Sequence, residues 1–284
     1  MKYDVRNDIL AISKILNLTL SQLSNHLGVA RSTITRIVNE ESYPSETFLE
    51  AFYSFAYNNH IKSIHLNELK VRYAQEKYGN ILFHGAKKPI EGVIDLNHSR
   101  SDIDIGVGFY LGESYEQSSS YIFPFKNSSV YIFSTNGFEK LKVVEFSVSL
   151  EWMLMVSFYR GQLDEYKESN IVNEIIKKVE SADVVIAPIA DNDMYEIMMR
   201  FARGDITDLQ ASASLSASDL GKQFVLKSKK AIESVKMVDR LYLCKQERND
   251  IETVRREKAL TAKKTAKELI ESLRRKGKYI EELL

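Results

Sequence analysis

The interpretation of this chain depends on one stretch, Gly106-Val107-Gly108-Phe109-Tyr110-Leu111, which continues into Gly112-Glu113-Ser114-Tyr115-Glu116-Gln117-Ser118-Ser119-Ser120-Tyr121. Two glycines bracket one residue before a short apolar run, so the pattern predicts a tight turn, a strand and the start of a helix. Glycine accepts a positive φ and lets a ligand approach the backbone closely, which favours the wall of a cleft. The same residues also fit an ordinary strand that packs through Phe109 and leaves Tyr110 half exposed.

A second motif, Leu82-Phe83-His84-Gly85, precedes this stretch. A single histidine at the end of a strand is usually structural, but the two motifs together resemble the ADP-ribosyltransferase fold of diphtheria-type toxins and poly(ADP-ribose) polymerases. In that superfamily a His-Gly on one strand and a Gly-x-Gly-[Phe/Ile]-Tyr on another clamp the nicotinamide half of NAD. The motif positions are occupied here by His84, Gly85, Gly108, Tyr110 and Tyr121.

Residues 80 to 240 resemble one bacterial branch in particular, the domain-of-unknown-function family numbered 3990. Its later motifs read Asp183-Val184-Val185-Ile186-Ala187-Pro188-Ile189-Ala190-Asp191-Asn192-Asp193 and Gln223-Phe224-Val225 in this chain. The resemblance implies an α+β fold with a split β-sheet. Gln223 stands where the superfamily carries its catalytic glutamate.

The resemblance also implies roles for these residues. His84 would hydrogen-bond the adenine-ribose hydroxyls, the Gly85 backbone would hold the carboxamide, and Tyr110 and Tyr121 would sandwich the nicotinamide. Gln223 would bind the nicotinamide-ribose hydroxyl. The reaction passes through an oxocarbenium-like transition state, so the protein mainly orients NAD and stabilises positive charge.

An amide at position 223 can hold a hydroxyl, but it cannot act as a carboxylate base. By sequence the nearest carboxylates that could serve instead are Glu113 and Glu116. A Gln223→Glu change is expected to keep the hydroxyl contact and add a negative charge beside the developing cation, so activity should be retained or raised. The polar segment before the glycine turn fits a surface loop, and its Arg100 is also a candidate for bidentate contact with an NAD phosphate.

The first 60 residues predict four short helices. Thr19-Leu20-Ser21-Gln22 fits a capping box, Gly28 ends that helix, and a second helix follows from Ser32 to Val38. This arrangement resembles the Xre/Cro repressor family, whose second motif helix enters the major groove of DNA. Ala30 is a weak cap for that helix, and a helical protein-interaction module fits the same pattern. The candidate DNA-binding residues are Arg31, Ser32, Thr33, Thr35 and Arg36.

Composition limits the other classes of function. Lys plus Arg and Asp plus Glu both number 39, so affinity for nucleic acid must come from a local patch. The single cysteine, Cys244, excludes an intrachain disulfide and a cysteine-rich metal site, and we expect it to be a small, partly buried residue. Asp191 and Asp193 are expected to cap a helix, not to bind metal. No apolar run is long enough for a membrane helix, which predicts a cytoplasmic protein.

The sequence therefore predicts four segments: a helix-turn-helix domain (1–62), a helical connector (63–79), a transferase-like domain (80–240) and a charged helical tail (241–284). The tail pattern is helical from Ser228 onward and fits dimerisation, docking on the transferase-like domain or capture of a partner.

The expected function is an NAD-dependent ADP-ribosyltransferase with a DNA-binding domain, the toxin of a toxin–antitoxin or phage-defence module. The alternative is a transcription regulator whose degenerate domain senses NAD or ADP-ribose without turnover. NAD would be a substrate, with no metal. The expected partners are DNA, a cognate antitoxin, a macromolecular ADP-ribose acceptor and a second copy of the chain, but no membrane.

Overall fold

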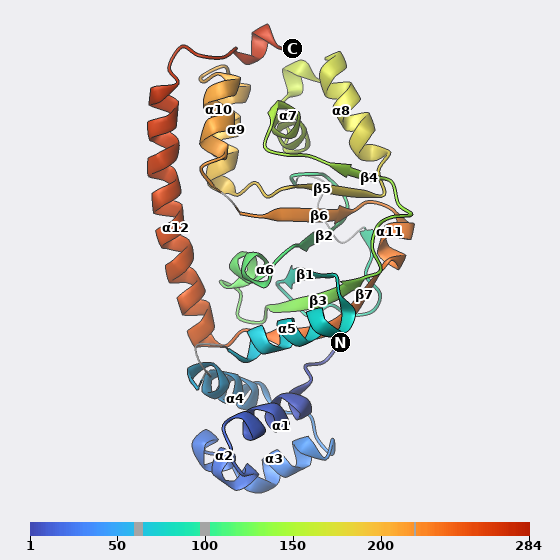
Figure 1. Cartoon of the computed structure of the whole chain (residues 1–284), viewed down its shortest axis with the longest axis vertical. Coiled ribbons are helices and arrows are strands. Elements are labelled where there is room, and N and C mark those ends of the chain that lie inside the picture. Colours follow the sequence, from blue (N-terminus) through green and yellow to red (C-terminus); the bar gives the residue numbers. More distant parts are fainter. Residues whose placement is uncertain (60–64, 97–102, 219) are drawn as a thin grey trace. The chain divides into compact units, whose positions relative to one another are not determined.

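The computed structural model describes residues 1–59, 65–96, 103–218 and 220–284 (Figure 1). The chain divides into two compact units. The first comprises residues 1–91, 118–134 and 237–254, and the second comprises residues 92–117, 135–236 and 255–284. Each unit is described in turn.

The N-terminal part of the first unit is a group of four helices, as predicted (Figure 1). The second of them is capped by Thr19, whose hydroxyl accepts from Gln22 N at 3.2 Å while Gln22 Oε1 accepts from Thr19 N at 2.8 Å. This capping box confirms the predicted helix start, and Gly28 ends the helix with φ at 64°. Ala30 caps the third helix without a side-chain hydrogen bond. The helices are α1 (Val5–Ile15), α2 (Leu20–Leu27), α3 (Arg31–Val38) and α4 (Glu46–Asn58).

The sheet part of the first unit contains β1 (Ile81–Ala86), β3 (Ser129–Thr135) and the greater part of β7 (Val235–Tyr242). Strand β1 runs antiparallel to β3, with His84 opposite Tyr131, and β7 follows β3 in the strand order. Helix α5 (Leu66–Tyr78) precedes β1, and α6 (Tyr115–Ile122) ends in this unit.

The predicted helical connector (63–79) contains α5, before which His65 has an extended backbone; residues 60–64 lie outside the described part of the chain. The prediction of continuous helix from Ser228 is wrong. Helix α11 (Lys229–Glu233) is short, and strand β7 follows it. The spacing of Val235, Val238 and Leu241 suits a helix, but a short apolar run rich in β-branched residues pairs equally well as a strand.

The second unit contains four strands, which follow one another in the order β4-β5-β6-β2. Strand β4 is parallel to β5, and the other two pairs are antiparallel. Helices α7 to α10 gather beside these strands (Figure 1), and a core centred on the fully buried Trp152 fills the space among them. The strands are β2 (Phe109–Gly112), β4 (Val143–Glu145), β5 (Val184–Pro188) and β6 (Lys222–Leu226); the helices are α7 (Leu150–Tyr159), α8 (Asn170–Glu180), α9 (Asn192–Ala202) and α10 (Asp208–Leu215), with short 3-10 turns at Asp164–Tyr166 and Ile280–Glu282.

The charged tail forms α12 (Lys245–Ser272), which starts in the first unit and ends in the second. Its second half docks on α10, because Gln210 Nε2 donates to Ile270 O at 2.7 Å and Ser214 Oγ donates to Ala266 O at 3.2 Å. Because α10 lies within residues 80–240, this contact agrees with the predicted docking of the tail on that domain. In the part of the chain that the structure describes, no helix is both long enough and apolar enough to cross a bilayer.

A buried ionic network joins four elements of the first unit. The carboxylate of Asp8 on α1 accepts from the Tyr53 hydroxyl at 2.6 Å and from Lys70 Nζ at 2.9 Å, and Lys70 also lies 3.3 Å from Asp239 on β7. Burial raises the pKa of Asp8, and the nearby Lys70 opposes that shift. The N-terminal helices are thus joined to the sheet of their own unit by charge as well as by apolar packing.

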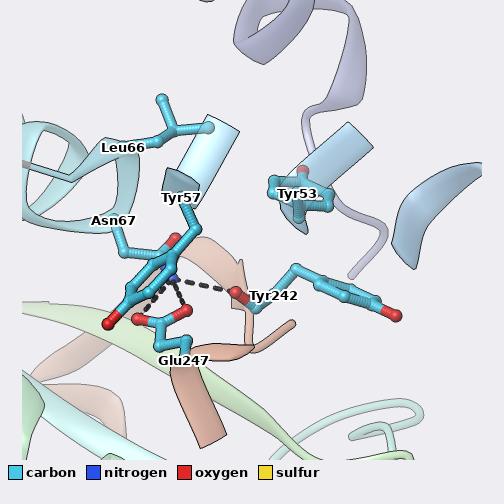
Figure 2. Close-up of a pocket in the computed structure, with 6 residues that line it drawn as sticks. All are labelled: Tyr53, Tyr57, Leu66, Asn67, Tyr242 and Glu247. Atoms are coloured by element: carbon cyan, nitrogen blue, oxygen red, sulfur yellow. Dashed lines mark hydrogen bonds between the residues drawn. The ribbon is translucent and has the colours of Figure 1, made fainter. Parts of the chain in front are cut away.

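A small cavity lies at the same junction, lined by Tyr53 and Tyr57 of α4, Leu66 and Asn67 of α5, Tyr242 of β7 and Glu247 of α12 (Figure 2). Asn67 Nδ2 donates to Tyr242 O at 2.8 Å and lies 3.1 and 3.2 Å from the two Glu247 oxygens. The free space is about 10 Å³, which is room for one water molecule and not for a nucleotide. We therefore assign this cavity to the packing of the unit.

Replacing Lys70 by Met should destabilise the protein by about 3–5 kcal/mol, because the buried Asp8 carboxylate would lose its cation. The double variant Lys70→Met/Asp8→Asn should recover much of that loss. Urea unfolding of the full chain, followed by circular dichroism, measures both. Equal stability of the Lys70→Met variant and the wild type would show that the network contributes nothing.

Candidate functional site

The residues predicted for NAD binding fall in both units, and each set is described within its own unit. In the first unit, His84 is half-buried on β1. A Cβ atom on Gly85 would lie 2.5 Å from Ser118 O and 3.0 Å from Ile122 Cγ2, so the glycine lets α6 pack closely on β1. Tyr121 on the same helix is 62% exposed, and Lys87 Nζ lies 5.0 Å from its ring centroid.

In the second unit the glycine turn is also closely packed. Gly106 has φ at 68°, the left-handed conformation that glycine accepts without strain. A Cβ on Gly108 would lie 2.5 Å from Val225 Cγ1 and 2.9 Å from Leu226 O on β6. Close packing of β2 on β6 therefore accounts for Gly108, and contact of this glycine with a ligand stays a prediction.

The hydroxyl of Tyr110 forms hydrogen bonds with the turn that precedes its own strand, β2. The hydroxyl donates to Gly106 O at 2.6 Å and accepts from Ile105 N at 3.2 Å. Burial raises the pKa of this phenol well above its usual value, so it remains protonated. Tyr110 thus holds the turn in place, whatever its ring contacts.

Gln223 is buried on β6, and its side-chain amide has two acceptors. Nε2 donates to Asp104 Oδ2 at 3.2 Å and to Pro188 O at 3.0 Å. A primary amide carries two N–H groups, so both donors are used and the amide orientation is fixed. The other polar atom of the side chain is the carbonyl oxygen, which can only accept hydrogen bonds.

Asp104 is the centre of this site, with 7% of its surface exposed. Its Oδ1 accepts from Arg160 Nε at 2.8 Å and also from Arg160 Nη2, and its Oδ2 lies 3.4 Å from Ala190 N. Arg160 follows α7, donates to Ala190 O at 3.2 Å and stacks over the Tyr195 ring at 4.4 Å. The buried carboxylate is thereby paired with a guanidinium that donates two charge-assisted hydrogen bonds to one of its oxygens.

The Asp104–Gly106 segment has a further anchor in Lys227 at the end of β6. Lys227 Nζ donates to Ile105 O at 2.8 Å and lies 5.3 Å from the Tyr159 ring centroid. Burial lowers the pKa of this amine. Side chains from β2, β6 and the end of α7 thus meet on three consecutive residues.

Sequence reasoning missed the roles of Asp104 and Arg160. Asp104 stood among several polar residues before the turn, and only its place two residues before Gly106 set it apart. Arg160 lies 56 positions away, so no local pattern could link the pair. The carboxylate in contact with Gln223 Nε2 is Asp104, while the exposed Glu113 accepts from Lys222 N at 3.0 Å. Glu116 is exposed as well.

These contacts change the expectation for Gln223→Glu. A glutamate has no N–H to donate, so it would place a second carboxylate beside Asp104 and beside the Pro188 carbonyl oxygen. Like charges at hydrogen-bonding distance repel or force one group to keep its proton. We now expect this substitution to harm the site.

The other predicted site residues have varied positions. Arg31, Ser32, Thr33 and Arg36 are exposed on α3, whereas Thr35 is half-buried and donates its hydroxyl to Arg31 O at 3.1 Å. Arg100 lies outside the described residues. Asp191 caps α9 by accepting from Met194 N at 2.9 Å, as predicted, and Asp193 lies 2.9 Å from Lys263. Among the described residues, no group of three His, Cys, Asp or Glu is placed to hold a metal.

Comparison with known protein families assigns the larger part of the chain to one family. The chain belongs to the family described as "Protein of unknown function (DUF3990)", which covers residues 80–237. That range includes the glycine turn, Asp104, Arg160 and Gln223. No curated protein and no solved structure matches the chain.

Replacing Arg160 by Met should destabilise the protein by about 3–5 kcal/mol at pH 8, because Asp104 would be buried without its cation. A protonated carboxyl group costs less to bury than an unpaired carboxylate, so the variant should be less impaired at low pH than at high pH.

Thermal unfolding between pH 5 and pH 8 checks this expectation, with Arg160→Met/Asp104→Asn as the matched control. The control should lack the added pH dependence. A deficit in Arg160→Met that does not change with pH would contradict the assignment of the charge pair.

Proposed function

We propose that the chain is an NAD-dependent ADP-ribosyltransferase that also binds DNA through α2 and α3. The observation that carries the enzymatic part is Gln223. This residue occupies the third motif position of the transferase superfamily, and its amide is fixed so that the carbonyl oxygen can accept from a hydroxyl. A ribose hydroxyl is the group that this position holds in the proteins the chain resembles.

The chemistry places modest demands on the protein. Breaking the bond between nicotinamide and ribose develops positive charge on the ribose, and the nicotinamide leaves as a neutral ring. A fixed acceptor at Gln223 would orient the ribose, and His84, Gly85, Tyr110 and Tyr121 would bind the nicotinamide and adenine-ribose parts, as in the superfamily. Orientation of this kind supplies much of the catalysis in a dry site. The proposed reaction needs no metal.

The acceptor of ADP-ribose is proposed to be a macromolecule, as expected for the toxin of a toxin–antitoxin or phage-defence module. The capped helix pair and the exposed Arg31 and Arg36 support the DNA-binding part of the proposal. Both arginines can donate to guanine edges or to phosphates.

A second candidate is a regulator that binds NAD or ADP-ribose without turnover. The observation in its favour is that position 223 carries an amide and that Arg160 neutralises the carboxylate in contact with it. The two candidates differ in one measurable property, since an enzyme releases nicotinamide and a sensor retains intact NAD.

The proposed NAD contact of His84 predicts that His84→Ala abolishes nicotinamide release and leaves the thermal midpoint close to that of the wild type. The assay is incubation with NAD labelled on the adenylate part, with a cell lysate as the source of acceptor. His26→Ala, which replaces an exposed histidine on α2, is the matched control. Turnover by His84→Ala at the wild-type rate would remove His84 from the site, and absence of turnover in the wild type would favour the sensor.

The proposed DNA contact predicts that Arg36→Ala weakens binding by about 1–3 kcal/mol if the guanidinium reads a base. Arg31→Ala should weaken binding too, with a smaller salt dependence if it contacts phosphate. Gel-shift titration against DNA from around the protein's own gene measures both, and Arg72→Ala on α5 is the matched control. If both variants bind as the wild type does, α3 is not the recognition helix.

A further inference from the structure

The contact between Asp104 and Gln223 requires one hydrogen-bond donor and one acceptor. Neither the family description nor the motif alone shows this requirement. Gln223 Nε2 and Asp104 Oδ2 are 3.2 Å apart, and both residues are buried. One partner must donate and the other must accept. In this chain the acidic group is at position 104, so the donor must be at position 223.

Asp104 itself cannot turn away from Gln223. Its Oδ1 accepts from Arg160, and its Oδ2, which faces Gln223, also contacts Ala190 N. The carboxylate is therefore held at both oxygens. The second N–H of Gln223 is held by Pro188 O at 3.0 Å. The orientation of the Gln223 amide is thus determined by two acceptors, and only one of them is a side chain that substitution can change.

We infer that Asp104 is a positioning residue that sets which end of the Gln223 amide faces the ligand, and that it is the reason why this chain carries glutamine in place of glutamate. The role in catalysis rests on the proposed function, whereas the pairing of residues 104 and 223 does not.

The inference predicts that the hydrogen-bond donor and the acceptor can be exchanged between positions 104 and 223. In Asp104→Asn the new amide can keep its oxygen toward Arg160 and turn its N–H toward position 223, where it meets the N–H of Gln223. Gln223 must then flip and present N–H to the ligand. In Gln223→Glu two carboxylates face each other. In the double variant, the new amide at position 104 can donate to the new carboxylate at position 223, and one negative charge remains near Arg160. The hydrogen bond to Pro188 O stays lost, so the recovery is partial.

The test is a double-mutant cycle in the full chain with wild type, Asp104→Asn, Gln223→Glu and Asp104→Asn/Gln223→Glu. Thermal midpoints are measured from pH 5 to pH 8, and nicotinamide release is measured where the protein remains folded. Asp164→Asn, which replaces an exposed aspartate of the second unit, controls for the loss of a charge.

We expect each single variant to melt about 3 °C or more below the wild type and the double variant to melt closer to the wild type than either. The deficit of Gln223→Glu should grow as the pH rises, because two facing carboxyl groups avoid repulsion only while they share a proton, which is lost at higher pH. Nicotinamide release should fall about tenfold or more in each single variant and recover in part in the double variant. A merely structural role for Asp104 would not restore turnover with a carboxylate at position 223.

Additive losses in the double variant, with a midpoint below both single variants, would overturn the inference. Rescue of the midpoint without rescue of turnover would overturn the positioning role and leave only a packing role. If the wild type releases no nicotinamide, the proposed function fails, and the midpoints then decide the pairing alone: recovery in the double variant supports it and additivity overturns it.

Discussion

The arrangement of the second unit depends on the burial of one carboxylate. Taking the Asp104 carboxylate out of water costs several kcal/mol, and the cost is offset only if the group meets a cation and enough hydrogen-bond donors. Arg160, Gln223 and Ala190 N meet that requirement. Each contact also fixes the segment that supplies it, so the end of α7, strand β6 and the residue after β5 are brought to one point.

The same point determines the geometry of the glycine turn. Once Asp104 is held, Ile105 and Gly106 follow, and the Tyr110 hydroxyl and Lys227 amine bind their backbone groups. A loop with this many contacts changes shape only if several bonds break together. Such rigidity is what a site requires when its task is to orient a substrate.

Much of the fold could be predicted from the sequence wherever the signal was local. The Thr19–Gln22 capping box, the cap at Asp191 and the strand–helix pattern around Tyr110 each rest on residues a few positions apart, and the structure confirms them. The prediction of helix over the residues of β7 was wrong. This segment forms a strand because it pairs with β3, a strand far earlier in the chain, and its own periodicity does not show that pairing. The contacts at the centre of the candidate site could not be predicted for the same reason. The glycines and Gln223 carry motifs, but Asp104 and Arg160 acquire their roles only through contact.

One residue of the first unit gives direct access to its internal motions. The thiol of Cys244 is fully buried among the apolar side chains of the N-terminal helices, and burial raises its pKa to about 11. The native protein should therefore resist alkylation, since the reactive thiolate is both scarce and shielded. Labelling can proceed only during transient opening of that core, so its rate reports the free energy of opening without any added probe. The alkylation rate of Cys244 therefore measures how often the core of this unit opens.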